Sequence, residues 1–349
     1  MINIKQGDIL RADTEALVNT VNCVGIMGRG IALQFKKAFP ENFEAYVKIC
    51  KEKKLHPGVV YTYKLHTLGG PKYIINFPTK RHWKGQSKLE DIEAGLKALV
   101  QEVRTLGIKS ISIPPLGCGL GGLPWQTVVK QIMEETLSVL KDVEVNLYEP
   151  SGAPEAEQMV NRTEKPKMTV GRASLVLLIK KYLEAMLDDV VTLLEIHKLM
   201  YFMQEAGEKL RLNYKPAPYG PYAENLRHVL SMMESHFIEG FGEGTDDPDK
   251  KISVLPMAYK LAECCLQEYP ATRERLDKVT QLIDGFETPY GMELLSTVHW
   301  VVTREKPADI KRLITLVHKW SDRKSVIMKD EHIQIAYERL KQQKWVDAN

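Results

Sequence analysis

The first 150 residues alternate short apolar runs with longer stretches in which apolar residues recur every three or four positions. The helical spacing is clearest over 89–103 and 125–140. The alternation predicts an α/β fold with a largely parallel or mixed sheet between helices, which binds ligands where its strands end. The strand-like runs are ALVNTVN (16–22), VVYTYKLH (59–66), KYIINF (72–77), KSISIPP (109–115) and VEVNLYEP (143–150).

The pattern changes after residue 150. Residues 151–169 are polar, contain glycine and proline and show no period, which predicts a linker between residues 1–150 and a second domain. Helical spacing then dominates, so we expect a mainly α-helical domain over 170–349. The segments with this spacing are 174–187, 190–207, 222–237, 259–267 and 272–286.

Two apolar stripes in the second domain are expected to lie in its core rather than to face a partner. They comprise Leu193, Leu194, Ile196, Leu199, Met200 and Met203, and Leu226, Val229, Leu230, Met232 and Met233.

Composition is that of an ordinary globular protein of two domains, with 349 residues, 44% hydrophobic and 27% charged. A net charge of +3 excludes a strongly basic, histone-like nucleic-acid binder. No apolar run is long enough to span a bilayer and the amino end lacks a signal-peptide pattern, so we expect a cytoplasmic protein without membrane contact. Residues 1–150 carry 20 basic and 15 acidic side chains, and the remainder carries 28 and 30. Because basic side chains are in excess only in residues 1–150, we expect a phosphate-bearing ligand to bind the first domain.

The five cysteines are an odd number and lack zinc-ligand spacing. They predict reduced thiols and no metal site. Cys264 and Cys265 adjoin within a predicted helix, where we expect them to be buried.

Two glycine-rich segments each follow a predicted strand and precede a predicted helix. The first runs from Gly25 to Gly30, and the second from Gly117 to Gly122. Glycines let the backbone approach a phosphate closely, and a helix amino end offers N–H groups and a positive dipole. Two such loops in a basic domain predict a cradle for a diphosphate, whereas either loop alone is equally explained as a tight turn.

Three polar residues at strand ends are candidates for ligand chemistry. The Asp8 carboxylate suits an amine such as adenine N6, but also a helix cap, and the Asn22 amide suits ribose hydroxyls or a turn. Lys80 precedes the cations in Arg81-His-Trp-Lys84, so like-charge repulsion predicts a lowered amine pKa and a nucleophile or proton donor. A solvated basic loop is the alternative.

Four motifs, taken in order, resemble the macrodomain family of ADP-ribose-binding α/β folds over nearly all of residues 1–150. They are GDI (7–9), ALVNTVNCVGIMGRGIA (16–32), INFPTK (75–80) and IPPLGCGLGGLPW (113–125). The lysine after NFPT and the GCGL loop resemble the lysine-dependent ADP-ribosyl glycohydrolase branch. With HKLMYFMQEAG (197–207) and YGPYAENL (219–226), the whole chain resembles the antitoxins of DarT/DarG toxin–antitoxin systems.

In that family the toxin ADP-ribosylates thymidine in single-stranded DNA, and the macrodomain hydrolyses the N-glycosidic bond. The resemblance implies an enzyme without a cofactor, whose second domain binds and neutralises the cognate DarT-like ADP-ribosyltransferase. The acidic segment 239–249 is then either a substitute for DNA phosphates or an ordinary solvated loop. Alternative functions are a non-catalytic ADP-ribose reader and a hydrolase of ADP-ribosylated protein or O-acetyl-ADP-ribose.

The resemblance also implies a role for each residue that matches a family motif. Lys80 is the implied catalytic residue, and Gly121 stands where a related branch has an aspartate, which leaves no carboxylate partner for the lysine at that position. The implied ADP-ribose contacts are Asp8 and Ile9 at adenine; Thr20, Val21, Asn22 and Thr79 at the distal ribose; Gly28, Arg29, Gly30, Ile31, Ala32 and Leu33 at the diphosphate; and Gly117, Cys118, Gly119, Leu120 and Gly121 over phosphate and ribose.

Overall fold

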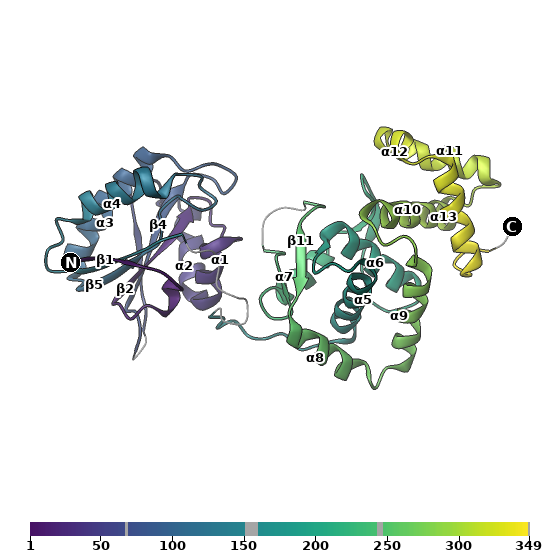
Figure 1. Cartoon of the computed structure of the whole chain (residues 1–349), viewed down its shortest axis with the longest axis horizontal. Coiled ribbons are helices and arrows are strands. Elements are labelled where there is room, and N and C mark those ends of the chain that lie inside the picture. Colours follow the sequence, from purple (N-terminus) through teal and green to yellow (C-terminus); the bar gives the residue numbers. More distant parts are fainter. Residues whose placement is uncertain (67–68, 151–159, 243–246, 348–349) are drawn as a thin grey trace. The chain divides into compact units, whose positions relative to one another are not determined.

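The chain forms two compact units (Figure 1), and each is described by itself. The computed structural model describes residues 1–66, 69–150, 160–242 and 247–347. One unit contains Met1–Glu164, and the other contains Lys165–Phe241 and most of the later chain. The division falls inside the segment expected as a linker, of which 151–159 lies outside the described residues. Residues 160–164 are part of the first unit, because Val160 packs on its core and Arg162 N donates to Lys37 O.

The first unit is built on a six-stranded sheet in the order β1-β6-β5-β2-β4-β3. Its neighbours pair in parallel, except that β3 runs antiparallel to β4. Each strand-like run therefore contains a strand, as expected. The strands are β1 (Ile2–Lys5), β2 (Ala16–Asn22), β3 (Tyr61–Lys64), β4 (Tyr73–Lys80), β5 (Ser110–Ile113) and β6 (Glu144–Tyr148).

Helices cover both faces of this sheet (Figure 1). Successive side chains of β2 point to opposite faces of the sheet, and each face packs against different helices. Leu17 packs in the cluster that contains α1 residues, whereas Val18 packs in the cluster formed with α3 and α4. The fold is the predicted α/β sandwich, with helices packed on both faces of the sheet. The helical elements are η1 (Ile9–Arg11), α1 (Gly30–Ala38), α2 (Pro40–Lys51), α3 (Leu89–Leu106), η2 (Trp125–Val129) and α4 (Lys130–Leu137).

One glycine fixes how closely α3 approaches the strand that carries the candidate lysine. A Cβ on Gly95 of α3 would lie 2.3 Å from the Phe77 ring on β4. No other residue type fits there without moving the helix or the strand. Close packing against α3 thus places β4, and with it Lys80.

The second unit is mainly helical, as predicted, with three short strands in one sheet and two in a hairpin. Helix α6 begins in a capping box, in which Thr192 and Glu195 each bond the other's backbone. Among the described residues, no helix combines the length and the apolar character needed to cross a membrane. The elements are α5 (Val170–Met186), β7 (Val191–Thr192), α6 (Leu193–Glu205), β8 (Tyr214–Ala217), β9 (Gly220–Ala223), α7 (Leu226–Met233), β10 (Ile238–Glu239), β11 (Lys251–Val254), α8 (Pro256–Leu266), α9 (Pro270–Ile283), α10 (Pro289–Glu305), α11 (Ile310–Lys319), α12 (Asp322–Ile327) and α13 (Asp330–Gln342).

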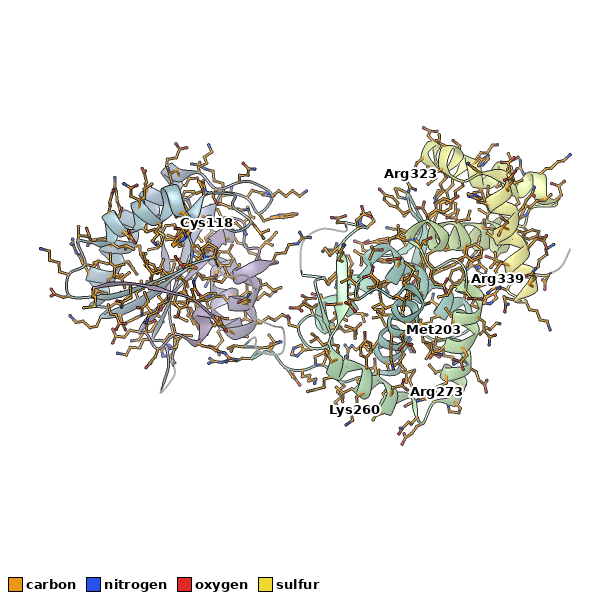
Figure 2. All side chains as sticks on the ribbon, viewed as in Figure 1. Cys118, Met203, Lys260, Arg273, Arg323 and Arg339 are labelled. Atoms are coloured by element: carbon orange, nitrogen blue, oxygen red, sulfur yellow. The ribbon has the colours of Figure 1, made fainter. Side chains whose placement is uncertain are left out.

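The core prediction holds for α6, whose whole stripe is buried, including Met203 in the interior of the unit (Figure 2). It is wrong for Met232 on α7, which is 49% exposed. The expected helices also start too early, since 191–192 and 220–223 are strands. These strands are only two and four residues long, too short for a period of two to stand out against helical spacing.

The cysteines are all unpaired in the structure. The expected burial is wrong for Cys264, which is exposed, whereas Cys265 is half-buried. Helix α8 buries Ala258, Ala262 and Leu266, which recur every four residues, and Cys264 lies off that face. Within the described residues, no three His, Cys, Asp or Glu side chains are grouped as metal ligands.

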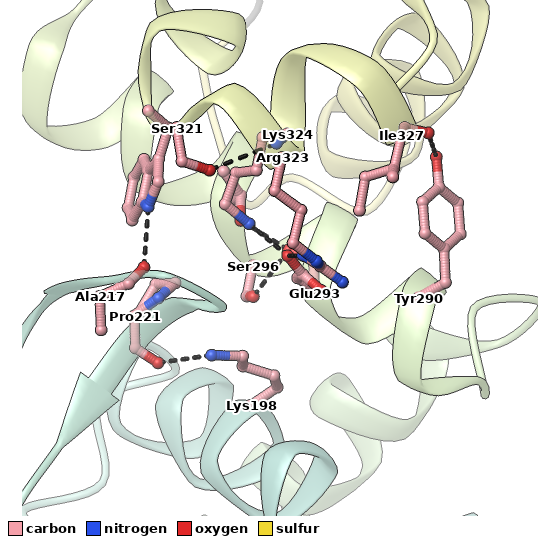
Figure 3. A network of polar contacts seen from close by, with 12 residues as sticks. Lys198, Ala217, Pro221, Tyr290, Glu293, Ser296, Ser321, Arg323, Lys324 and Ile327 are labelled. Atoms are coloured by element: carbon pink, nitrogen blue, oxygen red, sulfur yellow. Dashed lines mark hydrogen bonds and ion pairs between the residues drawn. The ribbon is translucent and has the colours of Figure 1, made fainter. Parts of the chain in front are cut away.

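A cluster of charges lies between helices of the second unit, with Glu293 and Lys324 buried and Arg323 exposed (Figure 3). Glu293 of α10 accepts hydrogen bonds through Oε1 from Lys324 Nζ and Arg323 Nη1 of α12, both at 2.6 Å. Lys198 of α6 donates to Pro221 O at 2.7 Å. Burial lowers the pKa of Lys198 to about 7, with a further decrease from the charge of Lys324. Buried charges of this kind depend on their partners, since water is absent.

Candidate active site

The candidate residues converge because parallel strands end at one edge of the sheet. β2 ends at Asn22 and β4 at Lys80, and the register pairs these two residues after an irregularity between Val21 and Asn22. The second glycine loop follows the neighbouring β5, which pairs with β2. Residues far apart in the sequence therefore share one end of the sheet, as the fold predicts.

Asn22 organises the loop that follows β2. Its Oδ1 accepts from Val24 N at 3.0 Å and Ile26 N at 3.4 Å, and its Nδ2 donates to Ile26 O at 2.5 Å. The buried Tyr46 hydroxyl donates to Asn22 O at 2.8 Å. The amide is thus engaged as the turn former that the sequence left as an alternative. Val21 packs in the core beside Tyr46, so its side chain faces away from any ligand at the strand end.

The first glycine loop leads into α1. Gly30 has φ +58°, and Arg29 at the cap position makes no side-chain capping bond. The first N–H groups of a helix have no intrahelical acceptors, so they are available to an anion. Ile31 and Ala32 face the clusters beneath the sheet, so this turn presents backbone rather than side chains.

The second glycine loop is held by backbone hydrogen bonds and by Ser87. Ser87 N donates to Gly121 O, and Leu123 N donates to Gly117 O, each at 3.0 Å. Gly117 has φ +74°. The loop also lies against the first one, because a Cβ on Gly30 would be 3.8 Å from Leu120 Cδ1. The two predicted phosphate loops are thus neighbours.

Gly121 leaves no room for a side chain. A Cβ there would lie 2.2 Å from Gly117 O and 2.3 Å from Ser87 Oγ. The departure from the aspartate-bearing branch is therefore built into the packing of this loop, and the missing carboxylate cannot be restored at this position.

We expect Gly121→Ala to lower the free energy of unfolding of the first unit by about 1–3 kcal/mol through overpacking. Gly119→Ala is the matched control, since a Cβ there meets nothing within 4 Å. Thermal unfolding of both variants tests this expectation. Equal melting temperatures for the two would contradict the tight packing at Gly121.

Lys80 lies between the strand end and the second loop. Its ammonium donates to Leu120 O, and burial lowers its pKa. The predicted direction is thus supported, but the predicted cause is wrong. Arg81, the nearest cation in sequence, is paired with Asp91, with Nη2 to Oδ1 at 2.9 Å. Desolvation by the loops, and not a neighbouring charge, lowers the pKa of the amine.

Asp8 has one satisfied and one unsatisfied carboxylate oxygen. Oδ1 accepts from Leu10 N at 2.9 Å and so caps η1, as one interpretation predicted. Oδ2 is buried without a hydrogen bond, 3.7 Å from Arg11 Nε. A buried acceptor with spare capacity is suited to an exocyclic amine. The Ile9 side chain is buried in the core, and its carbonyl accepts from Ala12 N at 3.1 Å.

The remaining candidates differ in what they offer. Thr79 is buried and Thr20 is half-buried. The Cys118 thiol donates to Leu116 O at 3.4 Å, and burial raises its pKa to about 11, so it is no nucleophile at neutral pH. Ser87 and Asp91 were not predicted from the sequence. Asp91 lies in the first turn of α3, where acidic residues are common because they interact favourably with the helix dipole. That common pattern does not indicate that Asp91 pairs with Arg81.

Comparisons with known proteins agree with this geometry. Residues 18–132 match the Macro domain family. A DNA ADP-ribosyl glycohydrolase of Thermus aquaticus is 44% identical over 97% of this chain and 93% of its own length. The chain belongs to the DNA ADP-ribosyl glycohydrolase family. The resemblance to macrodomains and the prediction of a glycohydrolase are thereby confirmed at the level of the family.

Two further members of this family match part of the chain. A DNA ADP-ribosyl transferase–DNA ADP-ribosyl glycohydrolase fusion protein of Thermosipho africanus is 36% identical over 43% of this chain and 42% of its own length. The solved macrodomain of Mycobacterium tuberculosis DarG is 53% identical, covering 43% of this chain and 99% of that chain, with a TM-score of 0.43.

Proposed function

We propose that this DNA ADP-ribosyl glycohydrolase family member cleaves the N-glycosidic bond between ADP-ribose and thymidine in single-stranded DNA, with Lys80 as its catalytic residue. The observation that carries the proposal is the position of Lys80. Its amine contacts the second glycine loop at Leu120, the first loop lies against Leu120, and burial lowers the amine pKa. A reactive amine beside two anion-binding loops suits chemistry on a nucleotide-linked sugar.

The proposed binding mode follows from the groups that each element leaves available. Asp8 Oδ2 accepts from adenine N6, and the first turn of α1 binds the diphosphate through the backbone N–H groups of Gly30–Ala32, since Leu33 N already donates to Arg29 O. The Gly117–Gly121 loop closes over the second phosphate and the distal ribose. The C1″ atom of that ribose then lies next to Lys80.

Lys80 can promote cleavage by either of two routes. As an ammonium it donates a proton to the departing thymine nitrogen while water attacks C1″. As a free amine it attacks C1″, thymine leaves with the bonding electron pair and takes a proton, and loss of the ring oxygen from C1″ gives an imine that water hydrolyses.

Borohydride distinguishes the two routes, since it reduces an imine to a stable amine. A peptide carrying reduced ribose at Lys80 after turnover in borohydride establishes the amine route. Full activity with no modified peptide establishes the proton-donor route.

The substrate is tested by presenting three compounds to one preparation of the full chain. We expect release of ADP-ribose from thymidine-modified single-stranded DNA to be fastest, ahead of ADP-ribosylated protein and O-acetyl-ADP-ribose. Preferential cleavage of either of the latter two would replace the proposed substrate. Binding of ADP-ribose without cleavage of any of the three would support a reader.

We further propose that the helical unit binds and neutralises a cognate DarT-like ADP-ribosyltransferase. The fusion of transferase and glycohydrolase in the Thermosipho africanus relative supports a partnership between these activities. The acidic segment 239–249 lies partly outside the described residues, and its Asp247 accepts from Asp249 N at 3.1 Å in a local turn.

A hydrolysis-deficient full chain separates neutralisation from repair. Lys80→Ala should still inhibit DNA modification by the toxin as the two proteins are titrated together. If only the wild-type chain lowers the level of modified DNA, removal of ADP-ribose alone accounts for the protection.

A further inference from the structure

The segment directly after Lys80 is an ordered basic turn. Gly85 N donates to His82 O at 2.9 Å, and Lys84 N donates to His82 Nδ1 at 3.2 Å. Arg81 is fixed to α3 by its ion pair with Asp91. The turn therefore has a defined position relative to the strand end that carries Lys80.

Three side chains of this turn form a layered stack on the surface, here called the His82–Lys84 stack. The His82 and Trp83 rings are stacked with centroids 5.6 Å apart and an interplanar angle of 29°, and Lys84 Nζ lies 5.0 Å from the Trp83 centroid. His82 and Lys84 are exposed, and Trp83 is half-buried. Trp83 also belongs to none of the hydrophobic clusters of the described residues. The fold therefore does not account for an indole at this position.

We propose that the His82–Lys84 stack binds the DNA strand beside the modified thymidine, with a neighbouring base on the Trp83 and His82 rings and Lys84 on a phosphate. This inference rests on the proposed function and specifies how its substrate is held. Every base has a π face and every nucleotide has a phosphate, so alternating rings and cations suit single strands of any sequence. A folded protein substrate offers no such repeat.

The position of the stack supports this role. Trp83 follows Lys80 by three residues, a chain span of at most about 11 Å. The thymine attached at C1″ and the next base of the strand are therefore within reach of one continuous surface. Lys84 can leave the indole for a phosphate as a base takes its place over the ring, because its side chain is exposed.

The test compares Trp83→Ala with wild type on two substrates, ADP-ribosylated thymidine nucleoside and a modified single-stranded oligonucleotide. We expect KM for the oligonucleotide to rise about 5- to 150-fold, which corresponds to one lost base–aromatic stack. KM for the nucleoside, kcat on both substrates and the Kd of free ADP-ribose should stay unchanged. Trp83→Phe should retain most of the affinity, since it keeps an aromatic face.

The salt dependence of KM tests the cation separately. Lys84→Gln should reduce the slope of log KM against log salt concentration for the oligonucleotide by about 0.7, the loss of one phosphate contact on a single strand.

Two results distinguish failure of this inference from failure of the proposed function. Unchanged oligonucleotide KM in Trp83→Ala, or an equal rise for oligonucleotide and nucleoside, overturns the inference while wild-type hydrolysis sustains the function. Absence of hydrolysis of modified DNA by the wild type overturns the proposed function and the inference together.

Discussion

Replacing Lys80 with alanine should reduce kcat for release of ADP-ribose from modified DNA by about 10²- to 10⁴-fold, the usual contribution of an acid–base or nucleophilic group. The loops that we propose for ADP-ribose are held mainly by groups other than the lysine, whose side chain contacts them at Leu120 O. The first is organised by Asn22 and Tyr46, and the second by Ser87. The Kd of free ADP-ribose should therefore change little.

Both quantities are measured on the same preparation, with turnover followed by release of ADP-ribose and affinity by calorimetry. Lys97→Ala is the matched control, because Lys97 is an exposed lysine on α3 that takes no part in the site. A parallel loss of affinity and turnover in Lys80→Ala would show a binding role for the lysine. Normal turnover would remove it from the reaction.

The convergence of the candidate residues was largely predictable because it follows from the connectivity of the sheet. A strand pattern followed by glycines or by polar residues is visible in the sequence, and parallel pairing gathers these segments at one edge. The sequence alone therefore predicts that Asn22, Lys80 and Gly117 lie near one another. The hydrogen bonds of the site were not predictable, because the partners of Asn22, Ser87 and Asp91 depend on how the loops fold and on which segments pack against them.

The cause of the Lys80 pKa shift illustrates the same limit. Sequence proximity places Arg81 next to the lysine, and repulsion is the natural expectation. Lys80, however, is the last residue of β4, and Arg81 lies beyond the strand in the turn that follows. Arg81 instead pairs with Asp91, ten residues along the chain, while the Lys80 amine is partly desolvated near Leu120. Although Arg81 follows Lys80 directly in the sequence, its charge is not what lowers the pKa of Lys80.

The buried charges of the second unit were also invisible in the sequence. Lys324 reads as one of several basic residues on an amphipathic helix, yet its side chain is 0% exposed. The reason is the position of α12 against α10, where Glu293 and the Thr297 hydroxyl meet the ammonium at 2.6 and 3.1 Å (Figure 3). Which lysines of the second unit are buried away from solvent can be seen only in the folded structure.

Glu293→Gln should lower the free energy of unfolding of the second unit by about 3–5 kcal/mol, because it leaves a buried cation without its counter-charge. For a unit of this size the loss corresponds to a decrease in melting temperature of roughly 6–20 °C. Glu338→Gln is the matched control. Glu338 pairs with Lys341 at 2.6 Å on the surface, so its loss should cost less than about 1 kcal/mol.

Thermal unfolding of the full chain with and without ADP-ribose assigns the transitions, since a ligand of the first unit raises only that unit's melting temperature. The transition that ADP-ribose leaves unchanged reports on Glu293. Adding Lys324→Met to Glu293→Gln should recover part of the lost stability, because it removes the unpaired charge and keeps an apolar side chain of similar length. If Glu293→Gln unfolds at the same temperature as Glu338→Gln, the Lys324 ammonium does not need the carboxylate. If the double variant is no more stable than Glu293→Gln, the loss arises from packing around the glutamine and not from the buried charge.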